Sequence, residues 1–160
     1  MSKVDALDKR IIIALEDDGR RPYRDIAREI GVAEATVRSR VNKLIDRGMI
    51  HITAVGDPLR LGVEVAAISL IRVRPGHIIA AANLLASFPN VRFVGTSFGS
   101  ADIIIQTLHS SAQELHHFIA DQVPKAIPEV ISTETFQLAE VLKSSWEWRT
   151  WFEGEAGVKS

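Results

Sequence analysis

Polar and basic side chains recur on one side of the helical pattern that runs from about Glu34 to Arg47. The apolar residues of this pattern, Val37, Val41, Leu44 and Ile45, fall on one arc at about 100° per residue. The other side and its flanks carry Ala35, Thr36, Arg38, Ser39, Arg40, Asn42, Lys43, Asp46 and Arg47. Hydroxyl, amide and cationic groups of this kind hydrogen-bond base edges and phosphate oxygens. This helix is therefore a candidate for entering a DNA groove.

A shorter helical pattern lies just before this one, and the two meet at Gly31. Glycine ends a helix readily because it adopts the left-handed conformation at little cost. Two helices joined by so short a turn are typical of the helix-turn-helix, whose second helix approaches base edges with its N-terminal part. We therefore expect bases to be read by Ala35, Thr36, Arg38 and Ser39, and phosphates to be contacted by Arg40, Lys43 and Arg47.

The same polar face also suits a helix that simply faces solvent, because two or three cations on an outer face are common. The short turn at Gly31 and the lack of a second apolar stripe on this helix favour DNA. A further helix precedes the pair, with Asp5 as a plausible N-cap, Asp8 in its first turn and a stop at Asp17-Asp18-Gly19. Met49–Val55 is expected to be a short extended segment, either a wing or a linker strand.

Composition limits the classes of protein to consider. The 160 residues are 46% hydrophobic and include no cysteine, which excludes disulfides, thiolate metal sites and a cysteine nucleophile. The apolar runs are far shorter than the roughly 20 residues that span a bilayer, so a cytoplasmic protein is expected.

Residues 1–50 hold 11 Lys and Arg against 9 Asp and Glu, whereas the other 110 residues hold 8 Lys and Arg against 11 Asp and Glu. So small a basic excess predicts weak DNA binding by one copy and an advantage for paired copies.

Strand periodicity begins after the breaks at Gly56, Pro58 and Gly62. Strands are expected over residues 64–74, 91–98, 103–108 and 130–142. Helices are expected around residues 78–85 and 115–123, the second ended by Pro124 and Pro128. The order βαββαβ predicts an antiparallel sheet with both helices on one face, as in ferredoxin-like sandwiches. The fold class is thus α+β: a winged-type helix-turn-helix of three helices (1–50), a linker (51–63), the βαββαβ domain (64–143) and an aromatic tail (144–160).

Both faces of the predicted sheet are apolar, as the run Ile103-Ile104-Ile105 shows. Helices with a single apolar stripe cover only one of these faces. A second copy of the same sheet is the simplest cover for the other face, so a two-fold symmetric dimer is expected.

The order of these motifs resembles the Lrp/AsnC family, the feast/famine transcription regulators. The resemblance covers residues 3 to about 143. It is carried by Val4-Asp5-x-x-Asp8, Asp18-Gly19-Arg20, Ile26-Ala27 before Gly31, Val37-x-x-Arg40-Val41-x-x-Leu44, Gly48-Met49-Ile50 and Gly99-x-x-Asp102. The resemblance implies a DNA-binding regulator that dimerises through its sheet, assembles further, often into a ring of four dimers, and binds a small effector, commonly an amino acid.

The resemblance also implies where the effector binds. Family effector sites lie between dimers, near the loop that matches Gly99, Ser100, Ala101 and Asp102, and a neighbouring chain adds the segment that matches Ser132, Thr133 and Thr135. A glycine allows a ligand to approach the backbone, a serine and free amides suit a carboxylate, and an aspartate suits an ammonium group. The alternative is that the loop is only a hairpin turn.

Two departures from the family pattern concern DNA. The family usually has a Ser or Thr cap where this chain has Ala33, and often a Ser near Pro22. An alanine in place of a hydroxyl cap costs about 0.5 to 2 kcal/mol and removes a possible phosphate donor. The tail residues Trp146, Trp148, Trp151 and Phe152 are expected to pack on a neighbouring subunit rather than to bind a ligand.

No catalytic motif or metal motif is found, and neither an enzyme activity nor a cofactor is expected. His116 and His117 are adjacent, and neighbours on a helix diverge by about 100°, which does not suit a shared metal. Some proteins built like this family are haem-pathway decarboxylases, so a tetrapyrrole decarboxylase is the alternative function. A ligand-sensing module with a vestigial helix-turn-helix is a third.

Overall fold

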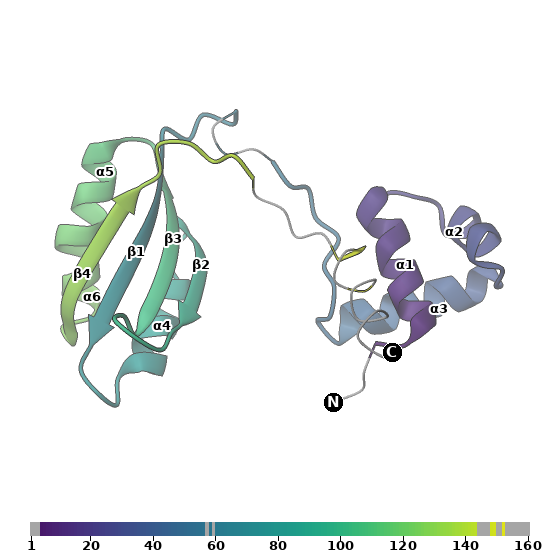
Figure 1. Ribbon diagram of the computed structural model, residues 1–160, viewed down its shortest axis with the longest axis horizontal. Coiled ribbons are helices and arrows are strands. Elements are labelled where there is room, and N and C mark those ends of the chain that lie inside the picture. Colours follow the sequence, from purple (N-terminus) through teal and green to yellow (C-terminus); the bar gives the residue numbers. More distant parts are fainter. Residues whose placement is uncertain (1–3, 57, 59, 144–147, 150–151, 153–160) are drawn as a thin grey trace. The chain divides into compact units, whose positions relative to one another are not determined.

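The computed structural model describes residues 4–56, 58, 60–143, 148–149 and 152 (Figure 1). The chain forms two compact units. One comprises Met1–Val55 together with Lys143–Ser160, and the other comprises Gly56–Leu142. The chain therefore passes between the units twice, and the tail that follows the second unit belongs to the first.

Three helices make the first unit: α1 (Ala6–Asp17), α2 (Tyr23–Ile30) and α3 (Glu34–Asp46). The Asp5 carboxylate accepts the Asp8 N–H at 2.8 Å, and the Asp8 carboxylate accepts the Asp5 N–H at 3.2 Å. This reciprocal pair is a capping box, and it confirms Asp5 as the N-cap. The helices bury a shared core of Ile11, Ala14, Leu15, Ile26, Ala27, Ile30, Val37 and Val41.

The turn between α2 and α3 depends on Gly31, which has φ 79°. The N–H groups of Gly31 and Val32 both donate to the Ala27 carbonyl, at 2.9 and 3.0 Å. This pattern closes α2 and starts α3 three residues later. Ala33 stands at the N-cap of α3 and provides no side-chain hydrogen bond, as the sequence predicted. Residues 49–55, where a short extended segment was expected as a wing or a linker strand, form neither helix nor strand.

The second unit has the predicted βαββαβ order, with one helix in three pieces. Its elements are β1 (Val65–Val73), α4 (Ile78–Ala86), β2 (Val91–Thr96), β3 (Ile103–His109), α5 (Ala112–His117), the π-helix η1 (Phe118–Gln122), α6 (Val123–Ala126) and β4 (Val130–Gln137). The strands form an antiparallel sheet in the order β2-β3-β1-β4. None of the helices in the described residues is long and apolar enough to cross a membrane.

Pro124 does not end the last helix, so that expectation was wrong. The Val123 N–H donates to the Phe118 carbonyl, five residues earlier, which is the bond of a π-helix. This wider turn places Pro124 in the first turn of α6, where its missing N–H costs little. The helix then continues to Ala126 and ends before Pro128.

The helices cover one face of the sheet (Figure 1). Ile71, Ile103, Ile105, Phe118 and Val123 are at most 1% exposed and form the centre of this core. Burying a side chain of this size contributes about 1.5 to 3 kcal/mol. The α-on-β layer is therefore the main source of stability in the second unit.

Within the described residues of this unit, no helix covers the other face, whose centre is apolar. Ile68 lies beside Phe136, and Leu70 lies beside Ile104, across the strands. A Cβ added to Gly95 would be 2.9 Å from the ring of Phe93, so the Phe93 ring lies across the glycine. Phe93 and Phe136 are 45% and 48% exposed. We call this surface, centred on Ile68, Leu70, Ile104, Phe93 and Phe136, the open sheet face.

Candidate nucleic-acid interface

The residues predicted to contact DNA lie on the outer surface of α3 and at its end. Val37, Val41 and Leu44 are at most 3% exposed and fix the orientation of the helix against α1 and α2. The predicted contact residues then face outward: Ala35, Arg38, Ser39, Asn42, Lys43 and Arg47 are exposed, and Thr36 and Arg40 are half-buried. Predicted core residue Ile45 is 37% exposed, so it lies at the edge of the buried stripe.

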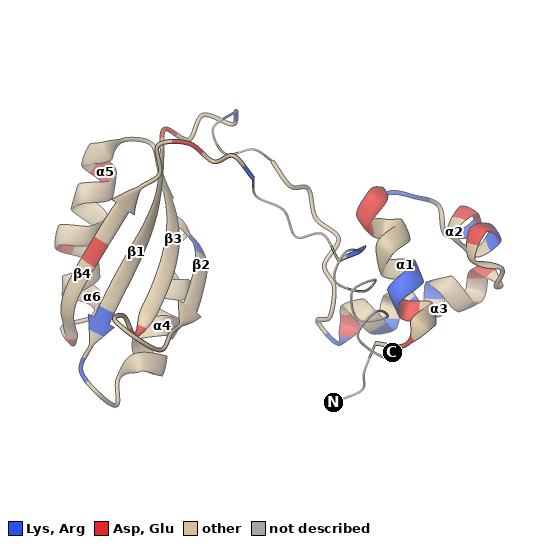
Figure 2. Ribbon diagram, viewed as in Figure 1, with Lys and Arg blue, Asp and Glu red and all other residues tan. Residues whose placement is uncertain are grey.

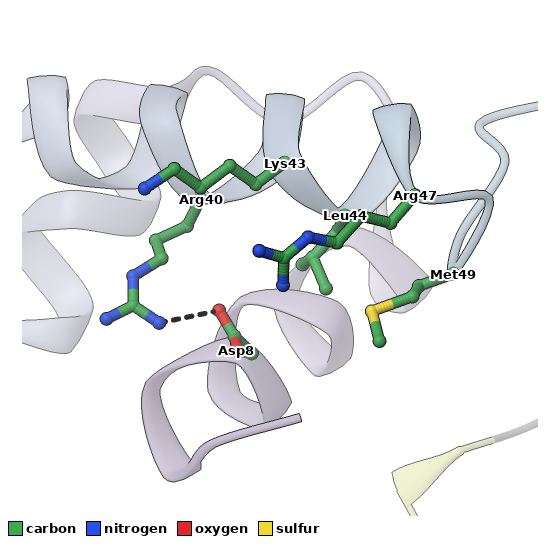
Figure 3. A pocket seen from close by; sticks show the side chains of 6 residues that line it. All are labelled: Asp8, Arg40, Lys43, Leu44, Arg47 and Met49. Carbon is green, nitrogen blue, oxygen red and sulfur yellow. Dashed lines mark hydrogen bonds and ion pairs between the residues drawn. The ribbon is translucent and has the colours of Figure 1, made fainter. Parts of the chain in front are cut away.

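Arg40 is held by the protein itself. Its guanidinium donates to the Asp5 carboxylate and, at 3.2 Å, to the Asp8 carboxylate (Figure 3). The Asp8 N–H and the Arg40 guanidinium, in that order, hold the pKa of Asp5 below its ordinary value. The same two carboxylates raise the pKa of Arg40. Arg40 therefore ties α3 to the capping box of α1.

A shallow hollow lies where α1 and α3 meet, lined by Asp8, Arg40, Lys43, Leu44, Arg47 and Met49. Figure 3 shows the Arg40 guanidinium turned toward Asp8, with the side chains of Lys43 and Arg47 reaching over the same hollow from α3. Lys43 and Arg47 are both exposed. They are therefore better placed than Arg40 to meet a phosphate group from solvent.

Arg38 has two partners on the surface. Its guanidinium donates to Glu34 at 2.7 Å, and its central carbon lies 5.3 Å from the centroid of the Tyr23 ring. An exposed ion pair at this helical spacing contributes only about 0.3 to 0.5 kcal/mol. A bidentate contact to a guanine contributes about 1 to 3 kcal/mol of discrimination. Releasing Glu34 in order to read a base would thus be favourable.

Charges of both signs are interspersed over the three helices, whereas the strands of the second unit carry only a few charges (Figure 2). On α2, for example, Arg28 pairs with Asp25 and Arg21 reaches Glu29. The described residues of this unit therefore form no broad cationic surface. DNA binding would depend on the few cations at α3 and on repeated copies of the unit.

The loop predicted to bind an effector joins β2 to β3. Gly99 has φ 125°, a conformation that favours glycine, and both Gly99 and Ser100 are exposed. Ala101 is buried. The Asp102 carboxylate accepts the Val73 N–H at 2.9 Å, and the Asp102 N–H donates to the Ile71 carbonyl at 3.0 Å. Asp102 thus secures the end of β1, at the bulge between Arg72 and Val73.

The second predicted effector segment lies on the other side of the same strand. Thr133 is paired with Ile71, and Ser132 is paired with Arg72. The end of β1 therefore lies between both predicted effector segments within a single chain. Thr135 faces the layer under the helices, where its hydroxyl lies 2.9 Å from the Ser69 hydroxyl. The Thr135 hydroxyl therefore already has a hydrogen-bond partner, the Ser69 hydroxyl, within the protein.

Sequence reasoning missed the residues that orient α3. The signals were present separately: Asp5 and Asp8 have capping-box spacing, and Arg40 stands on a flank of α3. These residues are 32 and 35 positions from Arg40, so only the packing of α1 against α3 brings them together. Tyr23 was likewise missed as a support for Arg38.

Comparison with known proteins agrees with this architecture. Residues 4–45 match the AsnC-type helix-turn-helix domain, and residues 72–150 match the PF0864 C-terminal dimeric alpha+beta barrel domain. An uncharacterized HTH-type transcriptional regulator of Pyrococcus furiosus is 40% identical over 141 residues, which cover 88% of this chain and 95% of the relative.

Solved structures share the fold over nearly the whole chain. AsnC of E. coli is 26% identical with a TM-score of 0.78, over 91% of this chain and 99% of that chain. The transcriptional regulator NMB0573 of Neisseria meningitidis, solved as an L-Met complex, is 17% identical with a TM-score of 0.77, over 93% and 99%. The two matched domains, the relatives and the shared fold together show that the chain belongs to the Lrp/AsnC family of transcriptional regulators and carries that family's DNA-binding helix-turn-helix.

Proposed function

We propose that this protein regulates transcription as a dimer or larger assembly that reads specific DNA sequences through α3, and that a small effector, an amino acid, modulates that binding. The observation that carries the proposal is the exposed polar face of α3, held outward by three buried valine and leucine side chains and by the Arg40 ion pairs.

The DNA contacts follow from the chemistry of this face. Arg38 and Ser39, near the N-terminal half of α3, read base edges, while Lys43 and Arg47 contact phosphates. In a two-fold dimer, two such helices meet half-sites about 34 Å apart or a multiple of it. Pairing the reading units compensates for the small basic excess of each one.

Dimerisation through the open sheet face supports this arrangement. Its two phenylalanines are roughly half exposed beside Ile68, Leu70 and Ile104. A second copy of the same sheet would remove this apolar surface from water. The matched domain is described as dimeric, which agrees with that packing. A tetramer of dimers, as in the family, would then place several reading units on one DNA.

The effector is proposed to bind at the β2–β3 loop. Gly99 and Ser100 present exposed backbone there, and Asp102 provides the carboxylate oxygen that does not accept the Val73 N–H. These groups suit the carboxylate and ammonium ends of an amino acid. A protein with the same fold was solved as an L-Met complex. The effector would act by favouring one assembly over another, which requires different affinities for the two.

DNA binding is tested by selecting sequences from a random DNA pool and measuring affinity against salt. We expect a common sequence and a linear fall of log affinity with log salt. Lys43→Gln should reduce the slope by about 0.9 per reading unit that contacts DNA. Arg38→Ala should lose about 1 to 3 kcal/mol and relax the choice of one base.

Lys125→Gln is the matched control, because Lys125 is exposed on α6 in the other unit. It should leave both slope and selected sequence unchanged. A pool that shows no enrichment, together with retention that does not depend on salt, would contradict the proposed function. Tetrapyrrole absorbance in the purified protein would favour the decarboxylase instead.

A further inference from the structure

Part of the C-terminal tail lies against α1 of the same chain. The N–H groups of Trp148 and Arg149 both donate to the Glu16 carboxylate, at 3.0 and 3.2 Å. The Arg149 guanidinium donates to Asp17 at 2.6 Å. One carboxylate thus receives two consecutive backbone N–H groups, and the next residue of α1 pairs with the side chain.

Aromatic contacts extend this attachment along α1. The rings of Trp148 and Phe152 stack with centroids 6.2 Å apart, and the Lys9 ammonium lies 5.2 Å from the Phe152 centroid. The Phe152 N–H donates to the Trp148 carbonyl at 2.9 Å, which holds the two rings on one side. We expected the tail aromatics to pack on a neighbouring subunit. These two lie on the same chain, and Trp146 and Trp151 are outside the described residues.

The surface of α1 that receives the tail includes an apolar side chain outside the three-helix core. Within the described residues, Ile12 is 7% exposed yet lies outside the three-helix core formed by Ile11, Ala14 and Leu15 with α2 and α3. Ile12 is three residues after Lys9 and four before Glu16, so all three share one face of the helix. Residues that hold the tail therefore flank a buried apolar side chain that the core does not use.

We propose that Trp148, Arg149 and Phe152 form a clasp on the outer face of α1, in the same chain, and that this clasp anchors the second of the two chain segments that join the DNA-reading unit to the sheet unit. The first connection is the segment that enters the sheet unit at Gly56, and the second is the segment that leaves it after Leu142. The polar face of α3 stays exposed, so the clasp does not block DNA. It restricts the orientations of the reading unit and hence the half-site spacing that a dimer accepts.

Hydrogen exchange tests the contact. In the wild type, the amides of Trp148 and Arg149 should exchange slowly because Glu16 accepts both. Glu16→Ala should bring their exchange to the rate of an unprotected chain, while the amides of α3 stay protected and report an intact fold. Arg10→Ala, an exposed position of the same helix, is the matched control and should change nothing. Rapid exchange in the wild type, or equal protection in Glu16→Ala, would overturn the clasp.

Crosslinking tests whether the contact lies within one chain. The sequence has no cysteine, so Asp17→Cys with Arg149→Cys provides the only two thiols, in place of side chains that are 2.6 Å apart, and leaves Glu16 and both rings of the clasp unchanged. A short bis-maleimide should give a crosslinked chain of monomer mass. A covalent dimer would show that the tail reaches a partner and would overturn the same-chain clasp, as would no crosslink. Arg28→Cys with Arg149→Cys, which places one thiol on exposed α2, should react much less.

The predicted effect of the clasp on DNA binding rests on the proposed function, and it is measured separately, as the affinity for different half-site spacings. Trp148→Ala with Phe152→Ala should bind well to half-site spacings that reduce wild-type affinity at least ten-fold. Identical spacing profiles would overturn the restricting role. If neither protein binds DNA, the proposed function fails, while exchange and crosslinking still decide the clasp.

Discussion

Among the cations of α3, Arg40 is bound by the protein and Lys43 faces solvent. Arg40→Gln leaves Asp8, which is only 9% exposed, without its cation. We expect this variant to lower the melting temperature of the DNA-reading unit, because a shielded carboxylate loses its partner. Lys43→Gln should weaken DNA binding and lower its salt dependence without changing the melting temperature. Thermal unfolding followed by circular dichroism separates the two, and equal melting temperatures would contradict the assigned role of Arg40.

His109 is a second residue whose surroundings determine its behaviour. It is 3% exposed at the end of β3, beside the Phe118 ring, and neither ring nitrogen has a hydrogen-bond partner among the described residues. Burial lowers the pKa of His109 below its ordinary value, against a smaller opposing effect of the Glu114 carboxylate. The unfolded chain therefore takes up a proton at a higher pH than the folded chain does.

Stability should accordingly fall as pH drops below about 6.5 and toward the folded pKa, by at most about 1.4 kcal/mol per pH unit for this single proton. Above about 6.5 the contribution of His109 is constant. Chemical denaturation at several pH values measures it. His109→Gln should flatten the fall, whereas exposed His116→Gln should leave it unchanged. If both variants show the wild-type pH dependence, His109 is not the group that causes the fall in stability.

At the scale of elements, the α2–α3 turn determines how α3 is presented. Gly31 has φ 79°, and a Cβ added there would meet nothing within 4 Å, so the effect of a side chain is purely conformational. Gly31→Ala should destabilise the unit by about 1 to 2 kcal/mol. Gly31→Asn should cost less, because asparagine tolerates this conformation. Urea unfolding measures both, and an alanine variant as stable as the wild type would contradict the role of the turn.

In the second unit, the open sheet face is the feature that should determine dimerisation. Ile104 lies at its centre, paired with Leu70 on β1 and Gly95 on β2. Ile104→Lys should turn the dimer into a monomer, because a buried charge without a partner is costly. The fold should persist, since the side chain points away from the helix-covered core.

Ile79→Lys is the control for that change, because Ile79 is 67% exposed on α4, away from the sheet. It should leave the dimer intact. Light scattering gives the mass of each variant at micromolar concentration. A wild type that is already monomeric, or an Ile104→Lys variant that stays dimeric, would exclude the open sheet face as the interface.

For the whole molecule, effector binding should couple stability to assembly. Screening the amino acids by thermal shift should identify one that stabilises the protein by about 2.7 kcal/mol at 100 times its dissociation constant. The same amino acid should change the oligomer distribution and the DNA footprint. Ser100→Ala should weaken this response without affecting DNA binding in its absence. Ser87→Ala, at the end of α4, is the control, and a panel without any response would refute effector sensing.

The sequence by itself determined the elements and their order. Apolar residues at helical spacing defined α1, α2 and α3, and apolar runs on both faces of the strands defined the sheet and its open face. The capping box at Asp5 and the turn at Gly31 could also be predicted, because each depends on residues within about five positions of one another. The prediction that Pro124 ends the last helix was wrong, because a local widening of the helix accommodates this proline.

Only the tertiary structure determined which residues of those elements contact one another. It brought Arg40 to Asp5 and Asp8, Asp102 to the Val73 N–H, and the tail to Glu16, 132 positions away. No periodicity encodes such pairs, because they depend on which helix faces and strand ends meet after packing. For the same reason, the sequence predicted Arg40 only as a phosphate contact, and its ion pairs with Asp5 and Asp8 became visible only in the fold.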